Sequence, residues 1–175
     1  MRDSGFEQAE QESFMVLDLA TVAAQPVDDT LISQVDDEQG IRDAIQVQEQ
    51  VWGGNFDWQY RHLVSLKQST PDEISIYVVY LQGQPVTSAW LTFNGESPFA
   101  GIWGGSTIES ERGKGFFTHS CLISVLLKRK HAVKKYLIID ASEMSRPIVE
   151  KNTVFSLLLT QRVMSSMLNK ESPWT

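Results

Sequence analysis

The stretch of residues 104–118, GGSTIESERGKGFFT, constrains the fold of this chain more than any other segment. An apolar strand runs here into a glycine-punctuated turn that opens a helix. Gly113 and Gly115 can take positive φ without a Cβ penalty, so consecutive backbone N–H groups can point into one concavity. The helix dipole adds positive potential at this end, and Arg112 and Lys114 add two cations. The stretch therefore predicts an anion site for a phosphorylated ligand.

Two standard phosphate-binding motifs do not fit these residues. A Walker A loop requires Lys-Ser or Lys-Thr after a glycine, and a dinucleotide fingerprint requires a glycine where Thr118 stands. The sequence R-G-K-G-F-F of residues 112–117 instead resembles the acetyl-CoA loop of the GNAT superfamily of N-acetyltransferases, [Q/R]-x-x-G-x-[G/A]. Arg112 matches its first position and Gly115 its fourth, whereas Phe117 stands where Gly or Ala is commonest.

Other segments carry the same resemblance, which covers about residues 31–151. They are V-W-G at 51–53, V-x-Y-L-Q-G-Q-P-V at 78–86, P-F-A-G-I-W-G-G-S-T at 98–107 and I-D-A-S-E-M-S-R-P-I-V-E-K at 139–151. The resemblance implies an α/β (α+β) fold. In that fold a mixed, mostly antiparallel sheet with helices on both faces is splayed around an acetyl-CoA site.

Hydrophobic periodicity and turn residues predict the individual elements. The predicted strands cover residues 31–35, 74–81, 85–93, 99–108 and 136–140, and the predicted helices cover residues 41–52, 58–68 and 115–133. Gly53 is expected to end the first helix, and Asp57 is expected to be the N-cap of the second. The glycines at 101, 104 and 105 predict a bulge or a close backbone approach by a ligand.

Length and charge limit the domain organisation. A chain of 175 residues, 42% of them hydrophobic, is long enough for one domain with a sizeable core. Residues 1–50 hold twelve acids and two bases, and we interpret residues 1–30 as an acidic N-terminal extension with little regular order before residue 12. Within it, residues 14–19 are expected to form a short helix or a docking segment. The GNAT-like acetyl-CoA-binding domain is expected over residues 31–151, and an atypical tail over residues 152–175.

Composition also excludes several classes of protein. The net charge of -7 argues against nonspecific nucleic-acid binding, whereas residues 112–135, with seven bases and no acid, lie where a polyanionic cofactor would bind. The alternative for the five bases at 128–135 is a solvated helix C-terminus. Without a signal-peptide pattern or an apolar run of about 18 residues, we expect a cytoplasmic protein that does not enter a membrane. The single Cys121 offers no Cys/His cluster, so no metal is expected.

The resemblance implies which residues hold the cofactor. Backbone amides of residues 113–118 would bind the CoA pyrophosphate, and the end of the preceding strand would pair with the pantetheine arm. The implied cofactor-binding residues are Thr107, Ile108, Arg112, Gly113, Lys114, Gly115, Phe116, Phe117 and Thr118. The side chains of Phe116 and Phe117 are interpreted first as core residues.

Catalytic residues are harder to assign. Transfer from a thioester to an amine needs a proton acceptor for the amine, an acid for the thiolate and a donor to the carbonyl. Where family members often carry Asn and a Tyr acid, this chain has Ser142 and Val149, and valine cannot donate a proton. Asp140, Glu143 and Glu109 are the candidate bases. Asp140 and Ser142 are kept as the catalytic candidates, with capping of the next helix near Ser142 as the alternative for Asp140.

The remaining aromatic and histidine residues have a structural interpretation beside the functional one. The candidate acids Tyr77, Tyr80 and Tyr136 are interpreted first as core strand residues, and His62, His119 and His131 as helical surface residues. Trp52, Trp90 and Trp103 are expected either to line an acceptor pocket or to belong to the core.

Two functions from different classes follow from the resemblance. The first is an N-acetyltransferase that moves an acetyl group from acetyl-CoA to an amine of a small molecule or peptide. The alternative is a non-catalytic GNAT-like module that binds CoA or a partner, or an inactive truncated homologue. Neither requires a nucleic acid, and both leave a homodimer open.

The sequence departs abruptly from the family pattern after Lys151. When the end of the chain is back-translated with permitted codons and read one base earlier, one of the possible products is EKKHGFQFIAYATGYEFNAQ followed by a stop. This product restores the family's G-F dipeptide. We therefore hypothesise a frameshift near Lys151 that removes the C-terminal strands and exposes the strand at 136–140 as a sheet edge. An amphipathic helix over residues 154–168 is expected to cover this edge only partly.

Overall fold

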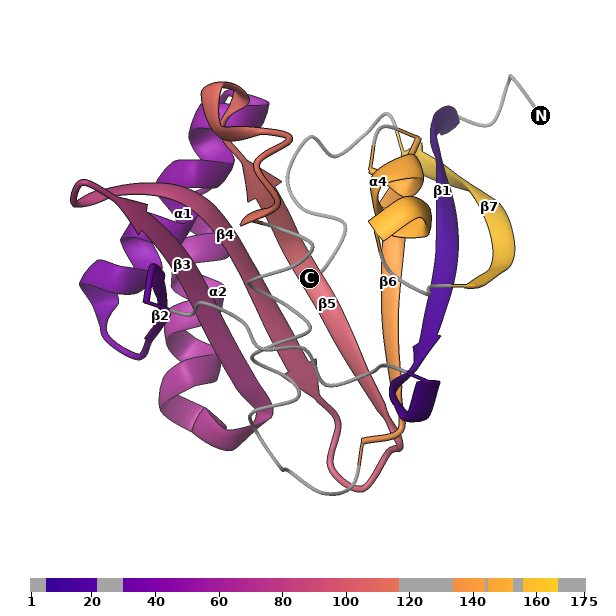
Figure 1. The fold of residues 1–175 in the computed structure, drawn as a ribbon, viewed down its shortest axis with the longest axis horizontal. Coiled ribbons are helices and arrows are strands. Elements are labelled where there is room, and N and C mark those ends of the chain that lie inside the picture. Colours follow the sequence, from indigo (N-terminus) through magenta and orange to yellow (C-terminus); the bar gives the residue numbers. More distant parts are fainter. Residues whose placement is uncertain (1–5, 22–29, 117–133, 144, 153–155, 167–175) are drawn as a thin grey trace.

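The computed structural model describes residues 6–21, 30–116, 134–143, 145–152 and 156–166. Within them one seven-stranded sheet runs through the molecule (Figure 1). Its spatial order is β2 (Ile32–Val35), β3 (Ile74–Leu81), β4 (Gln84–Phe93), β5 (Phe99–Thr107), β6 (Tyr136–Ser142), β1 (Phe6–Asp18) and β7 (Ser156–Ser166). Neighbouring strands are antiparallel except for β5 and β6, which are parallel. The predicted mixed, mostly antiparallel α/β fold is confirmed.

Two helices between β2 and β3 cover one face of the sheet. They are α1 (Glu38–Trp52) and α2 (Asp57–Ser69). Asp37 caps α1 by accepting the backbone N–H of Gly40 at 2.7 Å, and Gly53 ends it with φ +71°. The apolar face of α1 packs on β3 and β4 through Ile41, Ala44 and Ile45, together with Ile76, Val78 and Trp90 of the sheet.

The predicted N-cap of the second helix is wrong by one position. Helix α2 begins at Asp57 itself, and Phe56 occupies the cap. The backbone N–H of Asp57 is already taken by the side chain of Asn55 at 2.8 Å, and the Asp57 carboxylate binds Arg42 at 2.9 Å. Asp57 therefore joins α2 to α1 instead of capping α2.

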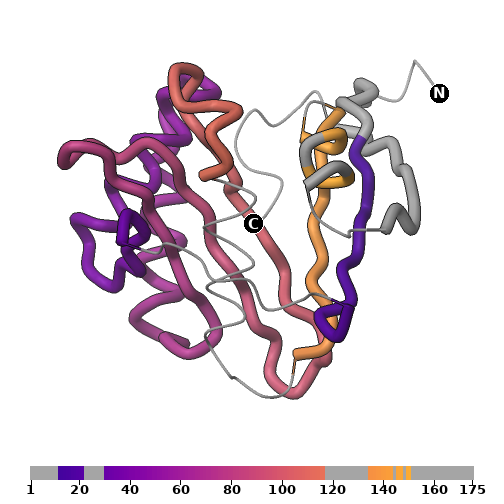
Figure 2. Tube along the Cα trace, viewed as in Figure 1, coloured from indigo at the N-terminus to yellow at the C-terminus, as the bar shows by residue number. Residues whose placement is uncertain are grey.

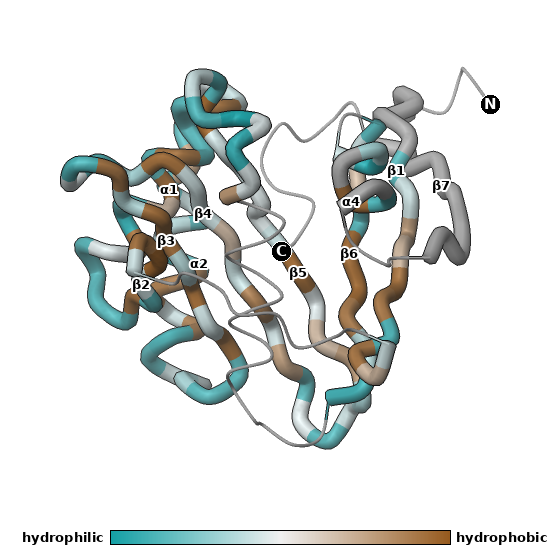
Figure 3. The backbone as a smooth tube through the Cα atoms, viewed as in Figure 1, coloured by the Kyte–Doolittle hydropathy of each residue, from teal (hydrophilic) through white to brown (hydrophobic). Residues whose placement is uncertain are grey.

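The opposite face of the sheet carries the larger core. Because side chains alternate along a strand, Tyr77 and Val79 of β3 point into it while Ile76 and Val78 point toward α1. Leu91, Ile102 and Leu137 extend this core across β4, β5 and β6 (the brown segments of Figure 3). Val149 of the short helix α4 (Arg146–Asn152) packs against it. Three short 3-10 turns, Leu19–Thr21, Pro71–Glu73 and Glu109–Glu111, complete the described elements, and the helix predicted over residues 115–133 lies outside the described residues.

The N-terminal segment corrects three expectations. Residues 6–18 form β1, which pairs antiparallel with all of β6, so neither disorder before residue 12 nor a helix at 14–19 is found (Figure 2 shows β1 beside β6). Ser13, Met15 and Leu17 alternate inward, and Met15 and Leu17 are fully buried in the core. The predicted exposed edge on β6 is also wrong, because β1 covers it.

The C-terminal segment corrects a fourth expectation. Residues 156–166 form the strand β7 along the outer edge of β1, where an amphipathic helix over residues 154–168 was expected. The prediction that C-terminal strands are missing is thus wrong for this segment. A strand satisfies the unpaired backbone groups of the β1 edge, whereas a helix would leave them exposed.

Candidate functional site

The strands β5 and β6 diverge at their carboxyl ends. Their parallel pairing ends at Ile102 and Ile139, yet β5 continues to Thr107 and β6 to Ser142 (Figure 2). A cavity of about 490 Å³ lies at this divergence. It is lined by residues 104–107 of β5, residues 111–113, 115 and 116 of the following loop, Asp140 and Ser142 of β6, and Gln48 and Trp52 of α1.

A β-bulge shapes the wall that β5 gives to this cavity. Two residues of β5, Gly104 and Gly105, lie opposite the single Ala89 of β4. Gly104 has φ +58°, and a Cβ placed there would lie 2.0 Å from the ring of Trp90. Only glycine fits this position. The bulge predicted from the glycines is therefore confirmed.

A chain of buried polar groups ties the bulge to α1. Gln48, which is 4% exposed, donates its side-chain amide to the carbonyl of Gly104 and to the hydroxyl of Ser88. Ser106 donates to Gln48 at 3.2 Å and accepts from the indole N–H of Trp52 at 2.9 Å. The sequence interpretation missed Gln48. Its position four residues after Ala44 and four before Trp52, on the buried stripe of the helix, is the signal that could have found it.

The loop after β5 has the backbone that the sequence predicted. Gly113 and Gly115 have φ of +78° and +84°, and a Cβ at either position would meet no atom within 4 Å. The Nε of Arg112 donates to the carbonyl of Thr107 at 3.0 Å, which fastens the loop to the end of β5. Lys114 forms an ion pair with Glu111 at 2.8 Å, a partner that the sequence interpretation overlooked because it precedes Arg112.

Two side chains beside this loop pack against the core of the protein. Phe116 and Ile108 pack against the larger core, and Ile108 also donates its backbone N–H to Val86 at 3.0 Å. The core interpretation of Phe116 is therefore confirmed. Phe117 and Thr118 lie outside the described residues.

Asp140 and Ser142 both line the cavity but make different contacts. The hydroxyl of Ser142 accepts the backbone N–H of Ser145 at 3.3 Å and lies 3.1 Å from its hydroxyl, so Ser142 organises the turn before α4. One carboxylate oxygen of Asp140 is buried and has no hydrogen-bond partner among the described residues. Burial raises the pKa of Asp140 above its ordinary value. Among the described residues, Ser142 and not Asp140 makes the hydrogen bonds of the turn before α4.

The tyrosines considered as acids lie away from the cavity. Tyr77 is buried in the core. Tyr80 donates its hydroxyl to Asp43 at 2.7 Å, and Tyr136 stacks on Phe99 with ring centroids 5.1 Å apart. All three lie on strands as expected, but only Tyr77 is a buried core residue, whereas Tyr80 and Tyr136 are partly exposed.

Among the remaining candidates that the structure describes, Trp52 alone lies at this cavity. Glu109 and Glu143 are exposed and do not line it. Val149 is 2% exposed in the core, and His62 lies on α2 at a second cavity. Trp52 lines the first cavity, whereas Trp90 and Trp103 line the second. His119, Cys121 and His131 lie outside the described residues.

Two further observations concern the described residues alone. They contain no group of three or more His, Cys, Asp or Glu side chains that could hold a metal ion. None of their helices is long and apolar enough to cross a membrane.

Comparison with known proteins gives no match in sequence and many in structure. Neither protein-family models nor curated protein sequences match the chain. A GCN5-related N-acetyltransferase from Kribbella flavida superposes with a TM-score of 0.63 at 12% identity, over 93% of this chain. The chain spans only 60% of the length of that protein.

Two enzymes of closer length show the same fold. Glucosamine-6-phosphate N-acetyltransferase from Arabidopsis thaliana has a TM-score of 0.51 at 18% identity, over 69% of this chain and 87% of its own. Aminoglycoside antibiotic 6'-N-acetyltransferase from Acinetobacter haemolyticus has a TM-score of 0.55 at 13% identity, over 75% and 93%. At these identities the likeness concerns the fold. The sheet order, the divergence of β5 and β6 and these neighbours together show that the chain has the fold of the GCN5-related N-acetyltransferases, the GNAT fold.

Proposed function

We propose that this protein is a GNAT-type N-acetyltransferase that moves an acetyl group from acetyl-CoA to a primary amine. The observation that carries the proposal is the cavity in which the diverging ends of β5 and β6, the glycine loop and Asp140 meet. The structural neighbours support it, because two of them are named for acetylation of small-molecule amines, glucosamine 6-phosphate and aminoglycosides. A cytoplasmic location remains part of this proposal.

The described residues suit a thioester cofactor with a pyrophosphate. Gly113 and Gly115 offer backbone N–H groups in a conformation that leaves the space beside them open. Beyond Ile102, the edge of β5 that faces β6 pairs with no strand of the described residues and is available to an extended arm. We assign Thr107 and Ile108 to the arm and residues 112–118 to the pyrophosphate. Because Lys114 is paired with Glu111, we expect Arg112 and the backbone to contribute more to pyrophosphate binding than Lys114 does.

Asp140 is the residue that we propose as the proton acceptor. Bound acetyl-CoA would supply the thioester carbonyl, at which the C–N bond would form while the C–S bond breaks; CoA would leave as its thiolate, and the nitrogen would lose a proton as the thiolate gains one. A protonated amine must first lose a proton before its lone pair can react. Asp140 lines the cavity and has a raised pKa, which makes its carboxylate a stronger base than an exposed aspartate. Ser142 positions the turn beside it.

One observation favours the second candidate, a GNAT-like module that binds CoA without turnover. Val149, which stands where family members often have a tyrosine acid, is buried in the core. The tyrosines of β3 and β6 do not line the cavity and cannot replace it directly.

Two measurements on the full chain distinguish the candidates. An acetyltransferase should release free thiol from acetyl-CoA in the presence of a suitable amine, and it should melt at higher temperature with acetyl-CoA bound. At one hundred times the dissociation constant, a ligand stabilises the folded chain by about 2.7 kcal/mol. A melting shift without thiol release across a broad amine panel would favour the binding module. Absence of both signals would contradict the proposed cofactor site.

A further inference from the structure

A second cavity, of about 640 Å³, lies between α2 and the strands β4 and β5. Trp58, His62 and Leu66 are four residues apart and form one wall from a single face of α2. Trp90 of β4 and Trp103 of β5 form the opposite wall. Gly104, the bulged residue, lines both this cavity and the first one. Gly104 therefore belongs to the walls of both cavities.

Three tryptophan rings line this cavity, and two of them, Trp58 and Trp103, are accessible. The indole N–H of Trp103 donates to the hydroxyl of Thr92 at 2.8 Å. A Cβ at Gly101 would lie 2.6 Å from that nitrogen, so the indole lies against Gly101. Trp103 is nevertheless 43% exposed and Trp58 is 40% exposed. Large exposed rings facing a cavity are typical of a surface that a ligand covers.

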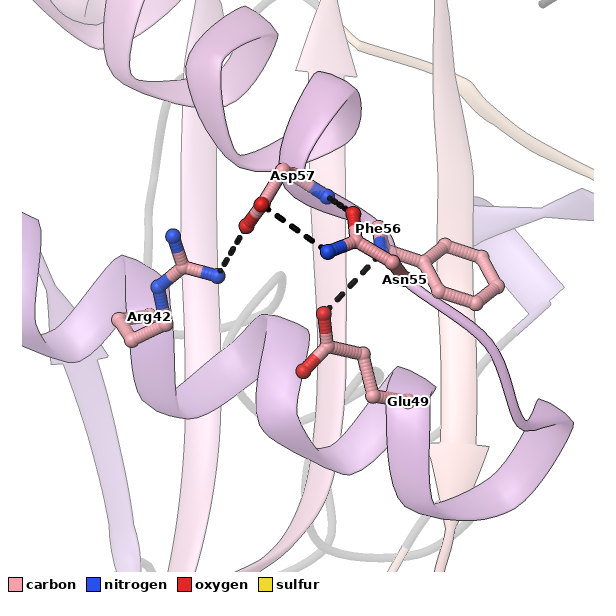
Figure 4. A network of polar contacts seen from close by, with 5 residues as sticks. All are labelled: Arg42, Glu49, Asn55, Phe56 and Asp57. Carbon is pink, nitrogen blue, oxygen red and sulfur yellow. Dashed lines mark hydrogen bonds and ion pairs between the residues drawn. The ribbon is translucent and has the colours of Figure 1, made fainter. Parts of the chain in front are cut away.

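The first turn of α2, which carries Trp58, is held firmly against α1 (Figure 4). Arg42 binds the carboxylate of Asp57 at 2.9 Å, and Asn55 donates to the other oxygen of that carboxylate at 3.0 Å. Glu49 accepts the backbone N–H of Phe56 at 3.0 Å. The start of α2 that carries Trp58 is thus fixed before any ligand arrives, which lowers the entropic cost of binding.

The described lining of this cavity carries a positive side-chain charge and no carboxylate. Arg61 is the only Arg, Lys, Asp or Glu side chain among its described lining residues. Its guanidinium makes no hydrogen bond or ion pair with the described part of the chain. Hydrogen bonds from Asn55 and Arg42 lower the pKa of Asp57, and the charge of Arg61 adds a smaller effect, but the Asp57 carboxylate is already engaged by the first two. The cavity therefore favours an anionic group and offers no carboxylate to a cation.

We propose that this cavity binds a primary amine whose body is an aromatic ring bearing an acidic group. The rings of Trp58 and Trp103 contact the aromatic body, Arg61 contacts the acidic group, and the amine reaches the first cavity beside Gly104. The role of this molecule as acetyl acceptor rests on the proposed function, whereas its binding does not.

Three matched probes test the chemistry on the full chain without CoA. They are 4-(aminomethyl)benzoate, 4-methylbenzylamine, which lacks the acid, and trans-4-(aminomethyl)cyclohexanecarboxylate, which lacks the aromatic ring. Binding is measured by calorimetry and by the change in tryptophan fluorescence. We expect the aromatic acid to bind about tenfold more tightly than either analogue, a difference of about 1.4 kcal/mol. Equal affinities of the three probes, or no binding of the aromatic acid, would overturn the proposal.

Substitutions in the cavity locate the binding. Trp58→Ala and Arg61→Gln should each weaken binding of 4-(aminomethyl)benzoate by roughly three- to tenfold. The matched controls Phe99→Ala, an exposed aromatic residue elsewhere, and Arg146→Gln, on α4, should bind as the parent does. Circular dichroism confirms that each variant is folded. Equal weakening by a control and its partner variant would contradict the assigned cavity.

A separate thiol-release assay keeps this inference distinct from the proposed function. Binding of the aromatic acid at this cavity, with no thiol release from it or from any amine of a broad panel, would support the binding site and contradict the acetyltransferase proposal. Thiol release with amines of every kind, without preference for aromatic acids, would support the acetyltransferase and contradict the role of the aromatic acid as its acetyl acceptor.

Discussion

Gln48 of α1 donates its side-chain amide to the main-chain carbonyl of Gly104, so the helix holds the bulge of β5 in place. Gln48→Leu keeps the side-chain volume but leaves the Gly104 carbonyl and the Ser106 hydroxyl with fewer buried partners. We expect the free energy of unfolding to fall by about 1–3 kcal/mol, the cost of unsatisfied buried polar groups. Chemical denaturation measures it. Gln39→Leu, at an exposed position of the same helix, is the control and should change stability little. A loss as large in the control would refute a special role for Gln48.

The glycine loop gives a prediction about cofactor affinity. Gly115→Val places a β-branched residue at φ +84° and fills the space beside the backbone N–H groups, so acetyl-CoA binding should be abolished. Lys114→Ala should weaken the binding free energy of acetyl-CoA by only about 1 kcal/mol, because this side chain is already held in an ion pair with Glu111. Calorimetric titration with acetyl-CoA measures both.

The control for this prediction separates backbone strain from loss of the site. Gly83→Val introduces a comparable strain at φ +77° in the turn between β3 and β4, away from the cavity. It should destabilise the chain but leave the affinity for acetyl-CoA unchanged. Unaltered affinity of the Gly115 variant would remove the assignment of the loop.

Asp140 gives a prediction about pH. Burial raises the pKa of Asp140 above its ordinary value, so the folded chain binds this proton more tightly than the unfolded chain does. The resulting stabilisation is complete below the unfolded pKa and is lost as the pH rises through the folded pKa. The uncharged variant Asp140→Asn should therefore gain stability relative to the parent as the pH rises from about 4 toward neutrality. Denaturation curves at several pH values measure this difference.

The same variant also tests the chemistry. Loss of a general base should lower thiol release by about 100-fold or more, with acetyl-CoA affinity unchanged. Asp72→Asn, at an exposed position, should show neither the pH-dependent gain nor the loss of activity. If Asp140→Asn retained full thiol release, another group would have to accept the proton.

The sequence predicted most of the fold because its elements obey local rules. The bounds of β3, β4, β5 and α1 follow from alternation, from the turn at Gly83 and from the helix end at Gly53. The positive φ of the loop glycines was also predictable, since glycine is the residue that adopts it without strain. These predictions needed no information about distant contacts.

The sequence could not predict what depends on strand pairing across the whole chain. The strand β1 pairs with β6 more than a hundred positions away, and its first half is rich in Gln and Glu, which gave no alternating apolar pattern. The second half, residues 14–17, is uniformly apolar and fits a helix or a strand equally well. Gln48 was missed for a similar reason, because its partners Ser88 and Ser106 lie on strands that only the fold brings together.

The frameshift hypothesis remains a prediction about the gene. Reading the codons for residues 152–169 in the neighbouring frame should give the G-F dipeptide and an alternating strand pattern. One expected consequence of the frameshift, an exposed sheet edge at β6, is wrong, because β1 covers this edge. If the neighbouring frame lacked that pattern, β7 would have to be explained as the native end of this sequence.

The burial of β1 predicts that the N-terminal strand is part of the folding unit. Leu17 is fully buried between β6 and the core, so Leu17→Ala removes buried methyl groups and leaves a cavity. We expect the free energy of unfolding to fall by about 2–5 kcal/mol. Leu31→Ala, at a leucine that is 42% exposed, is the matched control and should cost less than about 1 kcal/mol. Urea denaturation of the full chain compares the two variants. If Leu17→Ala cost no more than the control, β1 would be an appendage, and the boundary of the domain would return to residue 31.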